Sequence, residues 1–347
     1  MLISQLESSG ALRDPAVAQA FRSVLRHHFL PGRAFEEVYE DSAIMTKLGA
    51  EGIPISSSSQ PAIMAVMLQQ LRLQPGNRVL EIGAGTGYNA ALIARLIGPT
   101  GRLLTVDIDE DLCDQARANL AAAGIDGVQV VQADGADGWP AAAPYDRMIL
   151  TVSTTDLAPK WHEQLVEEGL LVAPVALAGP VQQSVAFRRR GPALFSTEVT
   201  CCGFMPLRGQ MAPAAPPAGT SPESWLEQAG RQIGYRLPAG DLWAGFESWL
   251  ALTHNDYVRR ERGFGLGGQR GAALVLGEGD ERVVSVFGEG DAAAEALAAA
   301  HRDWARTRPQ VDRLVVEAHP SGMEIPEDGP ARIVPRPHFT FVVRERS

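Results

Sequence analysis

The chain has 347 residues, more than one average domain, which suggests two domains, and its hydrophobic fraction of 45% is usual for a soluble globular protein. Its 41 acidic and 31 basic residues give a formal net charge of −10, which disfavours nucleic acid as a substrate because a polyanion is repelled. There is no apolar run long enough for a membrane span, no secretory signal and no metal or disulfide spacing among the three cysteines, so we expect a cytoplasmic protein without a bound metal.

The N-terminal part predicts two helices separated by a loop. Asp14 followed by Pro15 is typical of a helix start, because aspartate caps the helix and proline fits its first turn. A loop-rich stretch then runs to Ser59. A second helix is expected from Pro61, where apolar residues recur at helical spacing.

From residue 78 onward, strands and helices alternate. This alternation predicts a parallel sheet with right-handed crossovers, in an α/β fold. Two further extended segments, 181–187 and 193–201, predict an antiparallel hairpin. The expected strands lie near 78–82, 102–107, 127–131, 145–151 and 170–174, and the expected helices near 88–97, 110–123 and 159–167.

A glycine turn follows the first of these strands. The strand ends near Glu81, and Gly83, Gly85 and Gly87 come before the next helix. A dinucleotide-binding turn would place its third glycine at position 88, which is Tyr88 here. The spacing G-x-G-x-G behind an acid instead resembles the first motif of S-adenosylmethionine-dependent methyltransferases.

Two more strands end in acids. Asp107 closes the second strand, where a carboxylate can accept hydrogen bonds from a ribose diol, and Asp134 follows the third, where it can accept from an adenine amine. Either acid alone is more typical of a loop residue or a helix cap than of a ligand contact. Their order behind the glycine turn favours a nucleoside site at the carboxyl ends of the strands.

Residues 211–222 are rich in proline and alanine, a composition typical of an extended linker. We therefore expect a first domain over 1–210 and a second domain over 223–347. The second has the pattern of an α+β domain, and no catalytic motif is visible in it. Substrate recognition or packing is its expected role.

Several motifs together resemble the protein-L-isoaspartate (D-aspartate) O-methyltransferase family. They are YED at 39–41, ISSSSQP at 55–61, LEIGAGTGY at 80–88, the stretch from Gly138 to Thr151, and GFMPLRG at 203–209. The resemblance covers roughly residues 15–210. It implies a Rossmann-like methyltransferase sheet with an antiparallel hairpin at one edge, S-adenosylmethionine as cofactor, and a peptide or protein substrate with an aspartyl or isoaspartyl carboxylate.

The resemblance also assigns roles to single residues. Glu81 and the three glycines, Gly83, Gly85 and Gly87, correspond to the family's cofactor-binding turn. Asp107 corresponds to the ribose-binding acid, usually a glutamate in the family, and Asp134 to the acid beside the adenine.

The catalytic hydroxyl group is expected in the serine run. Ser59 corresponds to the serine of the family's T-I-S-x-P segment, beside the methyl group and the acceptor. Ser57 and Ser58 replace the threonine and isoleucine of that segment, so Ser57 is a second candidate. The alternative is a loop in which Ser59 or Gln60 caps the next helix.

Four functions agree with these residues. The departures from the family pattern, including Thr151 to Thr154 and the extra C-terminal region, resemble a subgroup that forms aspartimide or isoaspartate in ribosomally made peptides. We favour this tailoring role over general isoaspartyl repair. A small-molecule carboxyl methyltransferase and an inactive cofactor-binding module are the remaining alternatives.

Overall fold

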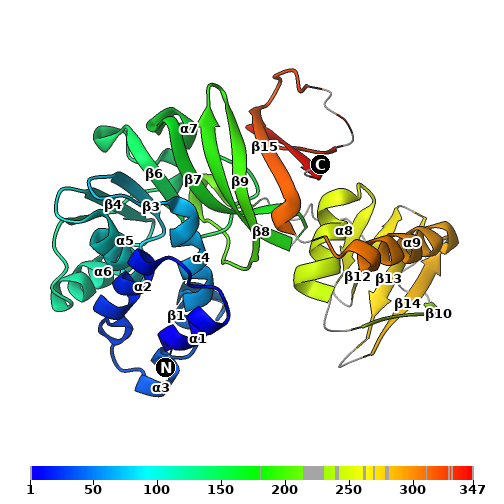
Figure 1. The fold of residues 1–347 in the computed structure, drawn as a ribbon, viewed down its shortest axis with the longest axis horizontal. Coiled ribbons are helices and arrows are strands. Elements are labelled where there is room, and N and C mark those ends of the chain that lie inside the picture. The colour runs from blue at the N-terminus through cyan, green and yellow to red at the C-terminus, as the bar shows by residue number, and fades with distance from the viewer. Residues whose placement is uncertain are drawn as a thin grey trace. The chain divides into compact units, whose positions relative to one another are not determined.

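The computed structural model describes residues 2–179, 181–213, 230–238, 242–260, 263–268, 270–277, 281–309, 311–326, 329 and 331–345 (Figure 1). The chain divides into two compact units. The first comprises Met1–Val175, Ser184–Glu198 and Cys202–Pro213, and the second comprises Ala176–Gln183, Val199–Cys201 and Ala214–Ser347. The expected linker lies outside the described residues from 214 onward. The domain boundaries inferred from the sequence therefore stay a prediction.

A mainly parallel sheet forms the centre of the first unit, as the alternation of strands and helices predicts. Its strand order is β9-β8-β7-β6-β3-β4-β5, and the pairs β3–β4, β3–β6, β4–β5 and β6–β7 are parallel. The two strands of the expected hairpin, β8 and β9, are neighbours in this sheet, although, contrary to the expectation, β9 is not its edge strand. The bounds are β3 Arg78–Ile82, β4 Arg102–Asp107, β5 Val128–Gln132, β6 Tyr145–Leu150, β7 Leu165–Ala178, β8 Val181–Arg190 and β9 Ala193–Cys202.

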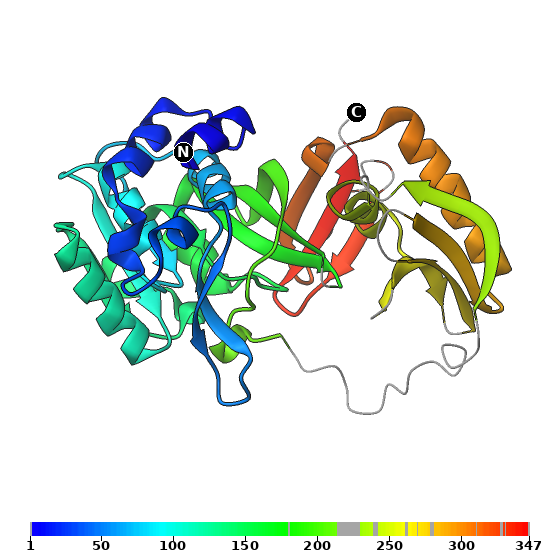
Figure 2. The same cartoon turned by 90° about the horizontal axis from the view of Figure 1, so that it is seen from below.

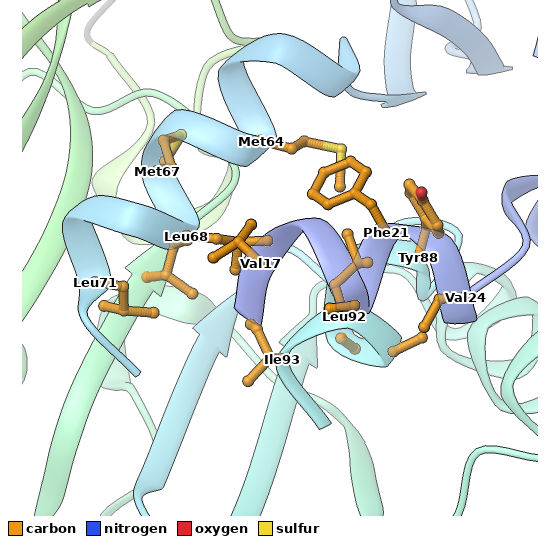
Figure 3. Close-up of a cluster of buried hydrophobic side chains, with 14 of the residues drawn as sticks. Val17, Phe21, Val24, Met64, Met67, Leu68, Leu71, Tyr88, Leu92 and Ile93 are labelled. Carbon is orange, nitrogen blue, oxygen red and sulfur yellow. The ribbon is translucent and has the colours of Figure 1, made fainter. Parts of the chain in front are cut away.

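Helices of the first unit bury a shared apolar core. Asp14 caps helix α2, as predicted, and accepts hydrogen bonds from the backbone N–H groups of Ala16 at 2.7 Å and Val17 at 3.1 Å. Figure 3 shows side chains of α2, α4 and α5 meeting in this core. The helices are α1 Leu2–Ser8, α2 Pro15–Ser23, α3 Phe35–Val38, α4 Pro61–Leu71, α5 Tyr88–Ile97, α6 Glu110–Ala122 and α7 Pro159–Gln164.

One expectation for the first unit is wrong. The stretch expected to be loop-rich contains a β-hairpin, made by β1 Ile44–Leu48 and β2 Pro54–Ser58. Its strands are short, and the second ends in three consecutive serines, so neither shows the alternation of apolar and polar residues that indicates a strand. In Figure 2 the hairpin is the blue two-stranded ribbon that extends away from the sheet of its unit.

The second unit has the α+β architecture expected from the sequence. Five antiparallel strands have the order β10-β14-β13-β12-β11, and helix α9 packs on them with Leu297 and Trp304 in their core. A further antiparallel group has the order β16-β17-β15. Among the helices that the structure describes, none is both long and apolar enough for a membrane span. The bounds are β10 Arg231–Pro238, α8 Ser248–Thr253, β11 Tyr257–Arg260, β12 Gly263–Gly268, β13 Gly271–Leu276, β14 Glu281–Gly288, α9 Asp291–Thr307, β15 Leu314–Pro320, β16 Arg332–Pro335 and β17 Phe339–Glu345.

Candidate active site

The glycine turn lies at the carboxyl end of β3, next to the end of β6. Gly83 has a φ of 101°, and a Cβ atom there would lie 2.4 Å from Oγ1 of Thr151. That hydroxyl group donates a hydrogen bond to the carbonyl oxygen of Gly83 at 2.6 Å. Only glycine fits such a turn. The turn is therefore fixed at the point where the strand order reverses, the usual ligand crevice of an open α/β sheet.

Asp107 links the end of β4 to this turn. One of its carboxylate oxygens accepts a hydrogen bond from the backbone N–H of Gly85 at 3.0 Å, and the other accepts from that of Asp109 at 3.3 Å. Burial raises the pKa of Asp107 above its ordinary value. The structure thus brings together the glycine turn and the acid predicted to bind a ribose.

Glu81 occupies a different environment from the other predicted residues. Its side chain is fully buried, and Oε1 accepts a hydrogen bond from Nδ2 of Asn89 in α5 at 2.8 Å. Oε2 has no hydrogen-bond partner among the described residues. Burial raises the pKa of Glu81 to about 7. In this position the carboxyl group connects β3 to α5.

Asp134 follows β5, and each of its two carboxylate oxygens accepts a hydrogen bond from a backbone N–H group. Its Oδ1 accepts a hydrogen bond from the N–H of Ala136 at 2.9 Å, and its Oδ2 accepts from that of Gln210 at 2.8 Å. Gly209 packs against it so closely that a Cβ atom there would lie 2.3 Å from Oδ2. A carboxylate oxygen has two lone pairs, so both can accept one more hydrogen bond from a ligand.

Residues 203–210, which contain the GFMPLRG motif, cross the carboxyl ends of the strands. The backbone of Ser153, three residues beyond β6, accepts a hydrogen bond from Leu207 at 2.7 Å and donates one to Met205 at 2.8 Å. The backbone N–H of Gln210 donates to Asp134, which follows β5. The 203–210 segment therefore runs along the carboxyl ends of the strands from β6 to β5. It therefore borders the predicted cofactor site.

An ion network that the sequence analysis missed joins the 203–210 segment to the hairpin. Arg208 donates two hydrogen bonds to Asp109, at 2.9 and 3.2 Å. Lys47 of β1 lies 2.9 Å from the same carboxylate and 2.6 Å from that of Asp111. The hydrogen bond from Arg208 lowers the pKa of Asp109. Three separate segments thus meet beside Asp107.

The serine run extends from β2 to the start of α4. A Cβ atom on Gly85 would lie 3.7 Å from the carbonyl oxygen of Ser57, so β2 packs against the glycine turn. Within the described residues, the hydroxyl groups of Ser57 and Ser59 have no hydrogen-bond partner, and both residues are partly exposed. Their hydroxyl groups are therefore available to an acceptor.

Neither Ser59 nor Gln60 caps helix α4 with its side chain. Gln60 occupies the cap position without a capping hydrogen bond. Asp41 performs this function, since its Oδ1 accepts from the N–H of Ala62 at 2.8 Å. The alternative interpretation is therefore confirmed for the position of the cap, which is Gln60. It is wrong for the loop, because residues 54–58 form strand β2.

Arg26, which the sequence did not reveal either, anchors the serine run from inside the protein. Its side chain is fully buried. Nη2 donates to the carbonyl oxygen of Ser59 at 3.0 Å and to Oγ of Ser58 at 3.3 Å. The guanidinium also donates to three carbonyl oxygens within residues 38–42, at 2.9 to 3.2 Å. One side chain therefore fixes the backbone on both sides of the hairpin.

Comparison with known proteins agrees with this geometry. The family model described as Protein-L-isoaspartate(D-aspartate) O-methyltransferase matches residues 1–212. A protein-L-isoaspartate O-methyltransferase of Methanopyrus kandleri is 36% identical over 218 residues, covering 60% of this chain and 90% of that protein. Protein-L-isoaspartate O-methyltransferase 1 of Rhodopseudomonas palustris strain HaA2 is 40% identical over 188 residues, covering 54% of this chain and 73% of that protein.

Two solved structures show the same fold. A protein-L-isoaspartate O-methyltransferase, 24% identical, has a TM-score of 0.57 and covers 91% of this chain and 95% of its own. A Plasmodium falciparum protein in complex with S-adenosyl-L-homocysteine, 18% identical, has a TM-score of 0.51 and covers 60% of this chain and 96% of its own. The family match over more than half of its length shows that the chain belongs to the protein-L-isoaspartate (D-aspartate) O-methyltransferase family of S-adenosylmethionine-dependent enzymes.

Proposed function

We propose that the enzyme esterifies an aspartyl or isoaspartyl side-chain carboxylate in one dedicated, ribosomally made peptide. The observation that supports the chemistry is the contact between β2 and the glycine turn. Because Ser57 packs against Gly85 while Gly85 donates to Asp107, the candidate acceptor site and the candidate cofactor site share one turn.

The residues present fit S-adenosylmethionine. Asp107 lies at the end of β4 with lone pairs left for ribose hydroxyl groups, and Asp134 lies at the next strand end, suited to an amine. Gly85 leaves room above the backbone, since a Cβ atom there would meet no atom closer than 3.7 Å. When bound, the cofactor supplies an electrophilic methyl group on a sulfonium sulfur.

The work left to the protein is orientation. An acceptor carboxylate, with an ordinary pKa of ~3.9, is already ionised at neutral pH and needs no general base. The Ser59 or Ser57 hydroxyl group donates a hydrogen bond to one carboxylate oxygen and so directs the other toward the methyl carbon. With the cofactor held by Asp107 and Asp134, the O–CH₃ bond would form as the S–CH₃ bond breaks. Orientation of this kind contributes several kcal/mol to lowering a barrier.

Methylation makes the acceptor reactive toward its own backbone. The ester has a better leaving group than the carboxylate, so the following backbone nitrogen attacks the carbonyl carbon and expels methanol. The resulting five-membered succinimide opens with water to aspartate or isoaspartate. The same intermediate thus serves both a tailoring and a repair function.

Two features support a dedicated peptide rather than a broad range of damaged proteins. The family match ends at residue 212, and the chain continues with a second unit that has its own sheet and core. The serine run and the residues from Thr151 to Thr154 also depart from the general family pattern. A protein that must recognise one partner gains from such additional surface, whereas broad repair does not require it.

General isoaspartyl repair is the second candidate, and one observation favours it. The solved protein-L-isoaspartate O-methyltransferase that covers 91% of this chain has an extra region of comparable extent. An additional C-terminal region therefore does not by itself indicate peptide tailoring.

The two roles are separated by substrate range. The enzyme and S-adenosylmethionine are incubated with two sets of peptides: isoaspartyl peptides of unrelated sequence, and aspartyl precursor peptides encoded beside the gene. Mass spectrometry follows the gain of one CH₂ and the later loss of methanol. We expect turnover of one precursor at a defined aspartate. Turnover of every isoaspartyl peptide would establish repair instead, and inert peptides with intact cofactor binding would favour a small-molecule acceptor or an inactive module.

Serine variants test the acceptor site. Ser59→Ala should lower kcat while the affinity for S-adenosylhomocysteine remains unchanged, because the hydroxyl group acts on the acceptor. Ser8→Ala, at an exposed position in α1, serves as the control. If Ser59→Ala retains full turnover and Ser57→Ala loses it, the orienting role belongs to Ser57.

A further inference from the structure

Exposed apolar side chains cluster near the serine run. Among the described residues, seven large hydrophobic side chains are exposed by 43 to 60%, and five of them lie between residues 25 and 53. Three belong to the β1–β2 hairpin and its turn: Met45 at 46%, and Leu48 and Ile53 at 60% each. Single exposed apolar residues are common on soluble proteins, whereas three on one projecting hairpin are a candidate interaction surface.

The strand register places this surface beside the candidate acceptor site. Met45 is directly opposite Ser57 across the antiparallel pair, and Leu48 is opposite Pro54. Side chains at opposed positions lie on the same face of the pair, with Cβ atoms roughly 5 Å apart. Met45 is therefore an immediate neighbour of Ser57. The register shifts on both sides of Lys47, so strict alternation of faces does not hold there, and Leu48, Ile53 and Pro54 are all exposed nearer the turn.

The hairpin presents little charge along this surface. Lys47 and Glu51 are its charged residues between positions 44 and 58. Lys47 is paired with both Asp109 and Asp111, so its charge is neutralised by acids at the start of α6. Arg33 donates a hydrogen bond to the backbone carbonyl oxygen of Met45 at 2.7 Å and is itself paired with Glu37. The side chains of Met45, Leu48 and Ile53 therefore suit an apolar ligand.

We propose that the β1–β2 hairpin binds the apolar residues next to the target aspartyl residue of the peptide substrate. This inference rests on the proposed function, and it names a specificity determinant of that site. A peptide that brings a carboxylate to Ser57 or Ser59 must lie beside Met45, because Met45 is the cross-strand partner of Ser57. The peptide thus buries Met45, Leu48 and Ile53 against its own aliphatic side chains.

Peptide binding is measured separately from methyl transfer, so that the inference about the hairpin can be rejected without rejecting the proposed function, and the reverse. Two fluorescently labelled peptides are compared that differ only beside a central aspartyl residue, with leucine and valine in one and serine and glycine in the other. Their Kd values are measured by fluorescence anisotropy with S-adenosylhomocysteine present. The variants are Met45→Ser and Leu48→Ser/Ile53→Ser. Met323→Ser, at an exposed methionine of the second unit, is the matched control.

The expected result is selective. Met45→Ser should weaken the apolar peptide about tenfold, the effect of losing one partly buried aliphatic contact, and should leave the polar peptide and the affinity for S-adenosylhomocysteine unchanged. Met323→Ser should change neither peptide. Equal Kd values for wild type and both hairpin variants would overturn the inference. It would also be overturned if Met45→Ser weakened peptide binding and at the same time dissociated a dimer in ultracentrifugation, because the surface would then bind a second copy of the chain. Absence of methylation with this binding pattern intact would contradict only the proposed function.

Discussion

Asp107 is the residue whose role at the site is most directly testable, since it joins the end of β4 to the glycine turn. Asp107→Ala should weaken S-adenosylhomocysteine binding by on the order of 1–3 kcal/mol, the cost of losing hydrogen bonds to a charged group. Isothermal titration calorimetry measures this directly. Asp114→Ala, an exposed acid on α6, is the control and should bind normally. An unchanged affinity for Asp107→Ala would remove the ribose assignment.

Arg26 is a second residue whose role can be tested, and it acts by positioning the backbone of other residues. Arg26→Lys keeps a positive charge, yet an ammonium group cannot reproduce the planar set of donors that spans residues 38–42 and Ser59. We expect kcat to fall by about 100-fold, because a displacement of about 1 Å at a reacting centre has that effect. The affinity for S-adenosylhomocysteine should change little. Steady-state kinetics check this split, and a loss confined to KM or to protein folding would contradict the positioning role.

Glu81 makes stability depend on pH. Its pKa is raised by burial to about 7 in the folded state, from an ordinary value of 4.5. The folded state therefore binds the proton more tightly, and the stability that this provides is complete below pH 4.5 and is lost as the pH rises through 7. The loss amounts to about 3 kcal/mol.

The measurement is urea unfolding at pH 5 and pH 8. Wild type should lose more unfolding free energy between these values than Glu81→Gln, whose amide does not titrate. Glu110→Gln, at an exposed position of α6, should behave like wild type. Parallel pH profiles for wild type and Glu81→Gln would show that Glu81 does not titrate in this range.

At the scale of an element, the 203–210 segment completes the edge of the site. Gly209 has a φ of 82°, and a Cβ atom there would approach Asp134 to 2.3 Å. Gly209→Ala should displace either Asp134 or the segment, and we expect S-adenosylhomocysteine to bind at least about tenfold more weakly, equivalent to about 1.4 kcal/mol. Gly203→Ala is a matched control, since an added Cβ meets no atom within 4 Å. Equal affinities for the two variants would separate the segment from the cofactor site.

The elements of the first unit differ in how far the sequence predicts them. Strand β4 and helix α5 begin and end at the predicted residues, because buried parallel strands and a glycine-capped helix have strong local patterns. The β1–β2 hairpin was missed because its strands are short and are stabilised by contacts distant in sequence, such as that of Arg26 with Ser58. Tertiary contacts override weak local propensity in such segments.

The candidate site follows the same division. Motif spacing identified the glycine turn and the acids at two strand ends, which the structure places around one sheet edge. Arg26 could not be found in this way, because its partners are mainly backbone carbonyl oxygens, which any residue provides. Arg208 lay within a recognised motif, but its partner Asp109 is 99 positions away.

At the scale of the whole molecule, every predicted cofactor residue belongs to the first unit. Addition of S-adenosylhomocysteine should therefore slow amide hydrogen exchange around residues 83–87, 107–109 and 134–136, because a ligand that binds only the folded state suppresses local opening. Amides of the five-stranded sheet of the second unit should exchange at their original rates. Mass spectrometry of peptic fragments distinguishes the two units, and protection confined to the second unit would contradict the site.

The path of the 203–210 segment also bears on how the protein is made. The glycine turn and the two strand-end acids leave the ribosome well before Arg208 and Gln210, which complete their surroundings. A nascent chain that stops short of Gln210 can form the strands but lacks the last contacts to Asp109 and Asp134. We therefore expect competence for ligand binding to appear abruptly once Gln210 has left the ribosome, rather than to grow with chain length.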